Sequence, residues 1–314
     1  MKKATLAILL CFTALIFGCT NSSSNQKTDA DLRKGTDGLT IELTKNAPPD
    51  KIFEDSIFPI AIKLQNKGAS NIEAGFLSVG MEQAFVTLLD QSKSTQPLKI
   101  EGKSLINQVG GQDYITLDAK TKKIGTQSES HPTTLFVTAC YQYKTVLGSS
   151  VCVDTDVFGL ANRKKTCTAQ DLQFANGQGA PVAITKIESR MFPSEDKNRI
   201  VPQFLLYVEN KGNGEVLVEN ALERACGNQP LKYTDFNRII VKASLSNQQL
   251  NCKITEESEA ILRLRDKKDV VRCTLDAGIE KSRDPYVAPL NIILDYGYTY
   301  TTSKDITIEK ILKY

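Results

Sequence analysis

The stretch Ile60-Ala-Ile-Lys-Leu-Gln-Asn66-Lys67-Gly68 has a second copy in the chain, Phe204-Leu-Leu-Tyr-Val-Glu-Asn210-Lys211-Gly212. In both copies apolar residues occupy every second position before the Asn-Lys-Gly sequence. This period of two is typical of a half-buried β-strand. Asn with Gly nearby favours a tight turn, where the backbone φ is positive. The stretch therefore predicts a strand and a turn that recur.

Two further blocks extend this internal repeat. Leu39–Leu43 aligns with Ala183–Ile187 at the same offset, and Tyr141-Gln-Tyr143 aligns with Tyr296-Gly-Tyr298 at a slightly longer one. The order of the three blocks is preserved, so chance is a poor explanation. We expect two homologous domains, residues 38–160 and 163–314, joined across residues 159–165.

Short alternating segments separated by turn residues predict that the domains are all-β. Many short strands at this spacing are typical of tandem antiparallel β-sandwiches. A few helical turns are expected near Met81–Leu89. The strand candidates are Leu39–Leu43, Ile60–Leu64, Leu98–Glu101, Tyr114–Leu117, Thr134–Tyr143, Ile239–Leu245, Ala260–Leu264, Val270–Leu275 and Leu290–Leu294.

The N-terminus reads as a secretory signal. Lys2 and Lys3 precede the apolar stretch Ala4–Phe17, which is shorter than the roughly 20 residues that cross a bilayer. Ile16-Phe17-Gly18-Cys19 resembles the lipobox of prokaryotic lipoproteins, although Phe17 is larger than usual there. We expect a signal peptide over residues 1–18 and a lipid on Cys19. Ordinary secretion and an uncleaved anchor are the alternatives; all three predict an extracytoplasmic chain.

The segment after Cys19 is polar. Residues 19–37 contain one aliphatic side chain, Leu32, among Ser, Asn, Asp and Lys residues. Such a composition buries too little apolar surface to offset the entropy of ordering. The segment is therefore expected to be a disordered tether between the membrane and the folded body.

Six of the eight cysteines remain after the signal and the lipid site are set aside. They are Cys140, Cys152, Cys167, Cys226, Cys252 and Cys273. An even number in a secreted chain, without a C-x-x-C spacing, predicts disulfides rather than a zinc or redox site.

The repeat suggests how these cysteines pair. Residues 141–153 read as a hairpin turning near Val146–Gly148, which predicts a Cys140–Cys152 bond. Both positions lack cysteine in the second repeat. Of the three connectivities left, Cys252–Cys273 is favoured, which leaves Cys167–Cys226.

Catalytic and metal-binding residue types are scarce. His131 is the one histidine and lies in a polar stretch, so it is expected in a loop. No nucleophile-elbow, zinc-protease or phosphate-loop motif occurs. Acidic pairs such as Asp154…Asp156 and Glu256-Glu257 lack a calcium-loop spacing and read as solvated surface. We predict no enzyme activity, no cofactor and no metal. The net charge of +3 includes Lys2 and Lys3, and the absence of basic runs argues against nucleic acid as a partner.

Five tyrosines alternate along the matched strands. They are Tyr141, Tyr143, Tyr296, Tyr298 and Tyr300. If exposed, their rings would form a candidate ligand face that stacks on sugars. If inward-facing, they would belong to the sandwich core, with their hydroxyls on polar partners. The core interpretation is favoured.

Several segments resemble immunoglobulin-like domains of the CARDB type. These are Gly38-Leu-Thr-Ile-Glu-Leu with Ala47-Pro-Pro-Asp-Lys-Ile, Phe58–Gly68, Gly177–Val182 and Pro289–Tyr300. Domains of this type occur in tandem in archaeal and bacterial surface proteins, including uncharacterised archaeal surface lipoproteins. The resemblance implies tandem immunoglobulin-like sandwiches with an adhesive, scaffolding or assembly role. It transfers no catalytic residue.

These observations favour a membrane-anchored, non-enzymatic surface module for adhesion, scaffolding or envelope assembly. Its expected partners are the membrane, through the N-terminal lipid, and other surface or envelope proteins. The alternative is a receptor lipoprotein that binds carbohydrate or peptide through the tyrosine-rich face, with glycans as partners. An enzyme on a β scaffold is the least favoured class.

Overall fold

The computed structural model describes residues 28–160, 164–196, 198–227, 229–253 and 261–311. These residues form an all-β fold of antiparallel sheets, as the alternation in the sequence predicts. Cys19, the signal peptide and Glu256-Glu257 lie outside the described residues. Among the described residues, no helix reaches the length and apolarity that a bilayer crossing requires.

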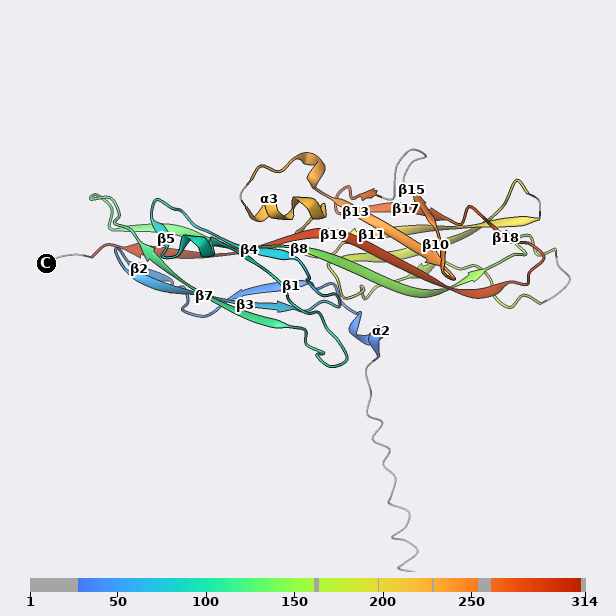
Figure 1. Cartoon of the computed structure of the whole chain (residues 1–314), viewed down its shortest axis with the longest axis horizontal. Helices are drawn as coiled ribbons and strands as arrows, with labels where there is room; N and C mark the ends of the chain where they lie inside the picture. The colour runs from blue at the N-terminus through green and yellow to red at the C-terminus, as the bar shows by residue number, and fades with distance from the viewer. Residues whose placement is uncertain (1–27, 161–163, 197, 228, 254–260, 312–314) are drawn as a thin grey trace, which may run out of the picture.

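Two 24-residue strands, β8 (Ser130–Val153) and β19 (Tyr286–Glu309), run along the length of the elongated body (Figure 1). They pair antiparallel from Tyr286↔Val153 to Glu309↔Ser130 without a register shift. Odd-numbered residues of β8 and even-numbered residues of β19 face inward over most of this length. The longest strand of each predicted domain thus pairs with that of the other in a common sheet.

The common sheet has nine strands, and its main path runs β14-β13-β19-β8-β4-β6. β12 also pairs antiparallel with β19, β16 pairs antiparallel with β13, and β2 pairs with β19 in the one parallel ladder of the described strands. The bounds of these other strands are β2 (Lys51–Phe53), β4 (Gly75–Gly80), β6 (Thr95–Pro97), β12 (Glu215–Leu217), β13 (Arg238–Leu245), β14 (Gln248–Gln249) and β16 (Ile261–Arg263).

Two smaller sheets complete the sandwich, one toward each end of the body (Figure 1). The four-stranded sheet has the order β1-β3-β7-β5, with β1 (Leu39–Leu43), β3 (Ile57–Asn66), β7 (Gln112–Thr121) and β5 (Val86–Leu88). The six-stranded sheet has the order β15-β17-β11-β10-β9, with β18 paired to β11. Its strands are β9 (Leu172–Gln173), β10 (Val182–Pro193), β11 (Arg199–Asn210), β15 (Asn251–Lys253), β17 (Lys268–Thr274) and β18 (Ile279–Glu280).

A single buried apolar cluster runs through both predicted domains, from Leu39 and Ile60 to Phe204 and Ile292. Strands from residues 38–160 and from 163–314 therefore share one sheet and one core. The repeat itself is visible in the matched order of β1-β3-β7 and β10-β11-β17. The division into two separate domains stays a prediction.

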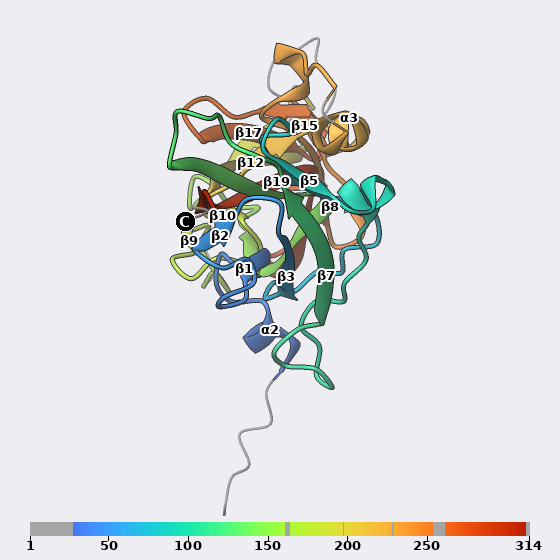
Figure 2. The ribbon, with the colours of Figure 1, turned by 90° about the vertical axis from the view of Figure 1, so that its left-hand side faces the viewer.

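In the residues that the structure describes, helical structure is limited to short pieces. Figure 2 shows α2 (Asp29–Leu32) at one side of the body and α3 (Leu222–Cys226) near the other. Three 3₁₀ turns are η1 (Gln91–Ser94), η2 (Glu219–Ala221) and η3 (Tyr233–Asp235). The helical turns predicted near Met81–Leu89 are wrong, because Val86–Leu88 pairs with β7 as an edge strand. Leu98–Glu101 adds one isolated bridge, Ile72↔Ile100, instead of a full strand.

The predicted tether is folded from Thr28 onward. Asp31 accepts hydrogen bonds from the Thr28 backbone and hydroxyl at 3.0 and 2.8 Å, and so caps α2. Leu32 is buried, and the Gly35 N–H donates to the Asn176 carbonyl. One well-placed aliphatic residue and a cap are enough to dock this segment, which composition alone had suggested would be disordered.

The predicted hairpin at Val146–Gly148 is wrong, because these residues continue β8. Cys140 and Cys152 are twelve positions apart on one extended strand, roughly 40 Å at about 3.3 Å per residue. A disulfide requires Cα atoms within about 7 Å, so this pair cannot form.

The described structure contains three disulfides, Cys140–Cys226, Cys152–Cys167 and Cys252–Cys273. The six cysteines are thus oxidised as predicted, and Cys252–Cys273 is confirmed as a cross-strand pair of β15 and β17. Cys167–Cys226 is wrong. Instead, Cys226 fastens α3 over Cys140, where Leu217 and Leu222 complete a small apolar cluster.

Candidate functional site

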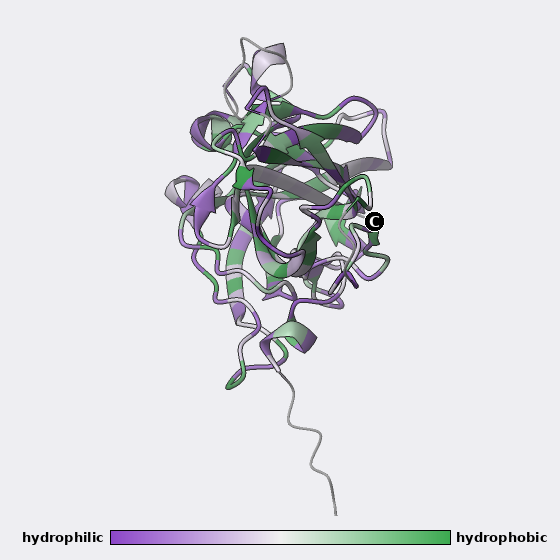
Figure 3. Ribbon diagram, turned by 90° about the vertical axis from the view of Figure 1, so that its right-hand side faces the viewer, coloured by the Kyte–Doolittle hydropathy of each residue, from purple (hydrophilic) through white to green (hydrophobic). Residues whose placement is uncertain are grey.

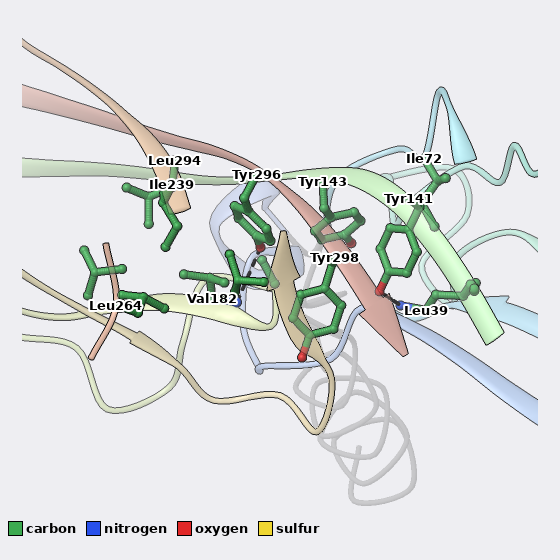
Figure 4. Packing of buried hydrophobic residues seen from close by; sticks show 14 of the residues in the cluster. Leu39, Ile72, Tyr141, Tyr143, Val182, Ile239, Leu264, Leu294, Tyr296 and Tyr298 are labelled. Carbon is green, nitrogen blue, oxygen red and sulfur yellow. Dashed lines mark hydrogen bonds between the residues drawn. The ribbon is translucent and has the colours of Figure 1, made fainter. Parts of the chain in front are cut away.

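Four of the five repeat tyrosines meet in the core, where β8 and β19 are in register. Tyr141 lies opposite Tyr298, and Tyr143 lies opposite Tyr296. Neighbouring ring centroids are 5.5–6.4 Å apart, mostly edge to face (Figure 4). All four side chains are at most 3% exposed, while Tyr300 is partly buried beside them. The core interpretation is therefore correct for these four rings, and they offer no stacking face for a sugar.

The two asparagines of the repeated Asn-Lys-Gly sequence hold the tyrosine hydroxyls. Tyr143 donates to Asn66 Oδ1 at 3.0 Å, and Tyr298 donates to Asn210 Oδ1 at 3.2 Å. The same oxygens accept from the Gly68 and Gly212 N–H groups, each at 3.1 Å.

The rest of each asparagine amide is satisfied in the same way in both repeats. The Asn66 amide donates to the Ser70 carbonyl, and the Asn210 amide donates to the Gly214 carbonyl. The repeat thus preserves a buried hydrogen-bond network and not only a strand pattern.

The two glycines are needed because a tyrosine hydroxyl packs against each of them, and not because their backbone is left-handed. Neither Gly68 nor Gly212 has a positive φ, so the predicted left-handed turn is wrong. A Cβ at Gly68 would lie only 1.9 Å from the Tyr143 hydroxyl, and one at Gly212 only 2.2 Å from the Tyr298 hydroxyl. Glycine is needed so that each ring can reach its asparagine.

The other two hydroxyls of the quartet bind β1 and β10, which are matched strands of the two smaller sheets. Tyr141 accepts from the Leu39 N–H at 3.2 Å, and Tyr296 accepts from the Val182 N–H at 3.4 Å (Figure 4). Burial raises the pKa of Tyr141, Tyr143 and Tyr296 well above the usual range, and that of Tyr298 to about 12. The quartet stays neutral and uncharged at physiological pH, as a structural core should.

His131 lies in β8 and not in a loop as predicted. Its ring stacks on Phe85 with a centroid distance of 3.6 Å, and its Nε2 lies 3.1 Å from Glu82. The hydrogen bond with His131 lowers the pKa of the Glu82 carboxyl. Asp154, predicted as solvated surface, is buried and pairs with Lys165 at 2.9 Å. Within the described ranges, no group of three or more His, Cys, Asp or Glu side chains is placed to hold a metal.

A groove of about 480 Å³ on the outer face of the common sheet is the best candidate for a binding site. Its lining includes Glu219 from η2, Ile240 from β13, Ile261 from β16 and Asp295 from β19. Ile240 and Ile261 are 41% and 36% exposed. The groove therefore combines open apolar surface with carboxylates.

Among Glu219, Asp235 and Asp295, Glu219 is the one carboxylate that makes no ion pair within 4 Å in the described part of the chain. Asp295 pairs with Lys242 at 2.8 Å and Asp235 pairs with Arg224 at 3.0 Å. Burial, followed by the nearby Asp295 charge, raises the pKa of Glu219, and the smaller effects of the Lys242 and Lys144 charges oppose this shift. A cation entering the groove would relieve this cost, because an opposite charge favours the ionised carboxylate.

The repeat relates this groove to the site that α3 covers. When Tyr141-Gln-Tyr143 is aligned with Tyr296-Gly-Tyr298, Asp295 corresponds to Cys140. Their cross-strand partners correspond as well, because Lys144 lies opposite Asp295 and Thr299 lies opposite Cys140. At Cys140 the outer face of the sheet is closed by α3 and the disulfide to Cys226. At Asp295 the equivalent face is the open groove. Sequence reasoning missed this site, because no motif marks Glu219, Ile240 or Ile261.

A scan against protein-family models and a search of curated proteins found no match to this chain. The resemblance to CARDB-type domains therefore stays a prediction.

Replacing Asn66 with Ala should destabilise the fold more than replacing Tyr143 with Phe. Asn66→Ala leaves the Tyr143 hydroxyl and the Gly68 N–H buried without acceptors, at a cost of roughly 2–4 kcal/mol. Tyr143→Phe leaves the Gly68 bond intact but removes the acceptor of the Ser70 backbone N–H, and should cost about 1–2 kcal/mol. Chemical denaturation measures both, with the exposed Tyr114→Phe as control. Equal losses for Asn66→Ala and Tyr143→Phe would contradict the network.

Glu219→Gln should stabilise the protein near pH 7 and not near pH 4. The folded protein raises the pKa of Glu219, so its contribution to stability is full below the unfolded value, about 4.5, and is lost as pH rises through the folded pKa. Glutamine does not ionise, so the variant does not lose this stability as the pH rises. Thermal unfolding from pH 4 to 7 checks it, with exposed Glu215→Gln on β12 as the matched control. A pH-independent difference would show that Glu219 is not strained by burial.

Proposed function

We propose that this protein is an extracytoplasmic lipoprotein, anchored through Cys19, that acts as a non-enzymatic surface module in adhesion, scaffolding or envelope assembly. The observation that carries this proposal is the closed tyrosine quartet beneath a long shared sheet. Because the four rings are buried, they cannot stack on a sugar, and the main argument for a carbohydrate receptor no longer applies. What remains for recognition is the outer surface of a body stiffened by β8 and β19.

Oxidised cysteines support the proposed location. Three disulfides, one of which links β8 to α3, suit an oxidising compartment outside the cytoplasm. The described chain begins at Thr28, only nine positions after Cys19, and is already docked on the body at Leu32. The proposed anchor would therefore hold the folded part close to the membrane.

The groove beside Glu219 is the proposed contact for a protein partner. Its exposed apolar side chains, and a Glu219 carboxylate that makes no close ion pair, suit a Lys or Arg side chain. The aliphatic stem of such a side chain packs on apolar surface while its charge meets the acid. Its counterpart at Cys140 is filled by this chain's own α3. We propose that a segment of an envelope protein occupies the second, open copy in a comparable way.

The test begins with mass spectrometry of the mature N-terminus, which should show a diacylglyceryl-modified Cys19. Cross-linking in the native envelope should then capture a specific protein partner. Capture should fall at least about tenfold in Glu219→Lys, because the charge next to the bound cation is reversed. Glu215→Lys, on the neighbouring strand β12, is the matched control.

Two results would reverse this proposal. An unmodified Cys19 would make the protein a released one. A glycan array that gives specific binding, while envelope cross-linking returns no protein, would favour the receptor alternative on a face other than the tyrosines.

A further inference from the structure

A loop on the same side of the body as α2 presents aliphatic side chains to solvent. Ile106 is 100% exposed, Leu105 58% and Val109 60%. The stretch Gly102–Gln112 around them has one lysine and no acidic residue. Three neighbouring aliphatic residues exposed on one loop are costly in water unless a surface covers them.

The loop is built to hold this shape. The Ser104 N–H donates to the Asn107 carbonyl, and the Asn107 N–H donates to the Ser104 hydroxyl, both at 2.9 Å. These bonds close a tight turn with Leu105 and Ile106 at its tip. The exposure of the two side chains is thus a property of an ordered loop.

The base of the loop is joined to the N-terminal segment through the first Asn-Lys-Gly turn. The Lys103 N–H donates to the Gly68 carbonyl, and the Ala69 N–H donates to the Gly179 carbonyl. The Gly179 N–H in turn donates to the Gly35 carbonyl, next to α2. Figure 3 shows an apolar loop tip and α2 on the same side of the body, at the bottom of the view.

The position of this loop indicates which surface covers its exposed aliphatic side chains. Eight residues, Thr20–Lys27, separate Cys19 from Thr28, and a chain of that length spans at most about 30 Å. A lipid on Cys19 would therefore keep the side of the body that carries α2 near the bilayer. We propose that the loop Ser104–Val109 inserts its aliphatic tip into the lipid surface and forms a second, non-covalent membrane contact. This inference rests on the proposed anchor.

Such a contact matches the physics of lipid anchoring. One acyl-type attachment fixes distance but not orientation, whereas an apolar loop beside it fixes which face looks outward. Figures 1 and 2 show α3 on the opposite side of the body from α2. With α2 toward the membrane, Glu219, which lies just before α3 in the chain, would be held away from the lipid.

The chain has no tryptophan, so a single introduced one reports on one place. The experiment uses the chain from Cys19 onward, which contains every described residue. Its other six cysteines form disulfides, so Cys19 supplies the free thiol. A maleimide lipid can therefore attach Cys19 to phosphatidylglycerol–phosphatidylethanolamine vesicles, whether or not the cell lipidates it. Ile106→Trp is the reporter, and Tyr233→Trp, at a 77% exposed position after α3, is the control.

On the vesicles, the emission of Ile106→Trp should shift to the blue and be quenched by brominated lipids, while that of Tyr233→Trp should not change. Adding Leu105→Ser and Val109→Ser should reduce the quenching severalfold, because apolar contact is lost. Water-like emission from Ile106→Trp on the vesicles would overturn the inference, as would a shift seen only after envelope proteins are added. Because the maleimide lipid supplies the attachment, an unlipidated Cys19 in the cell would leave this result intact.

Discussion

The in-register pairing of β8 with β19 is the constraint on which the rest of the structure depends. It places Gln142 opposite Gly297, the counterparts in the tyrosine alignment, and so forms a local pseudo-twofold centre. Around that centre Tyr141 must meet Tyr298, and Tyr143 must meet Tyr296. A shift of one residue would turn every side chain to the other face of the sheet, so the buried rings also fix the register.

The two copies of the repeat build the core at this centre in the same way, but they differ in what covers the outer face of the common sheet. Asn66 and Asn210 satisfy their tyrosines through the same hydrogen bonds, and Gly68 and Gly212 leave room for them. On the outer face the two copies diverge. One is sealed by α3 and Cys226, and the other, at Asp295, is an open groove beside Glu219. Divergence between repeats is where a binding surface can arise without disturbing the core.

Local patterns in the sequence predicted the all-β fold, the repeated strands and the cross-strand pair Cys252–Cys273. They failed where the answer depends on long-range pairing. Val146–Gly148 looks like a turn in isolation, but 24 residues of β19 hold it extended. Cys140 found its partner on α3, which lies on the far side of the common sheet from the tyrosines. Leu32 is buried because a capped helical turn positions it, and the overall composition of the segment does not reveal such a cap. No sequence motif marks the groove at Glu219.

The most direct test of this account is a designed cross-link between β8 and β19. Thr138 and Thr301 are opposite one another, with hydroxyl oxygens 2.9 Å apart. Thr138→Cys with Thr301→Cys should form a disulfide in the folded protein, seen by peptide mapping, while Thr138→Cys with Ser303→Cys, two residues out of register, should not. Equal cross-linking of both pairs, or of neither, would contradict the shared ladder.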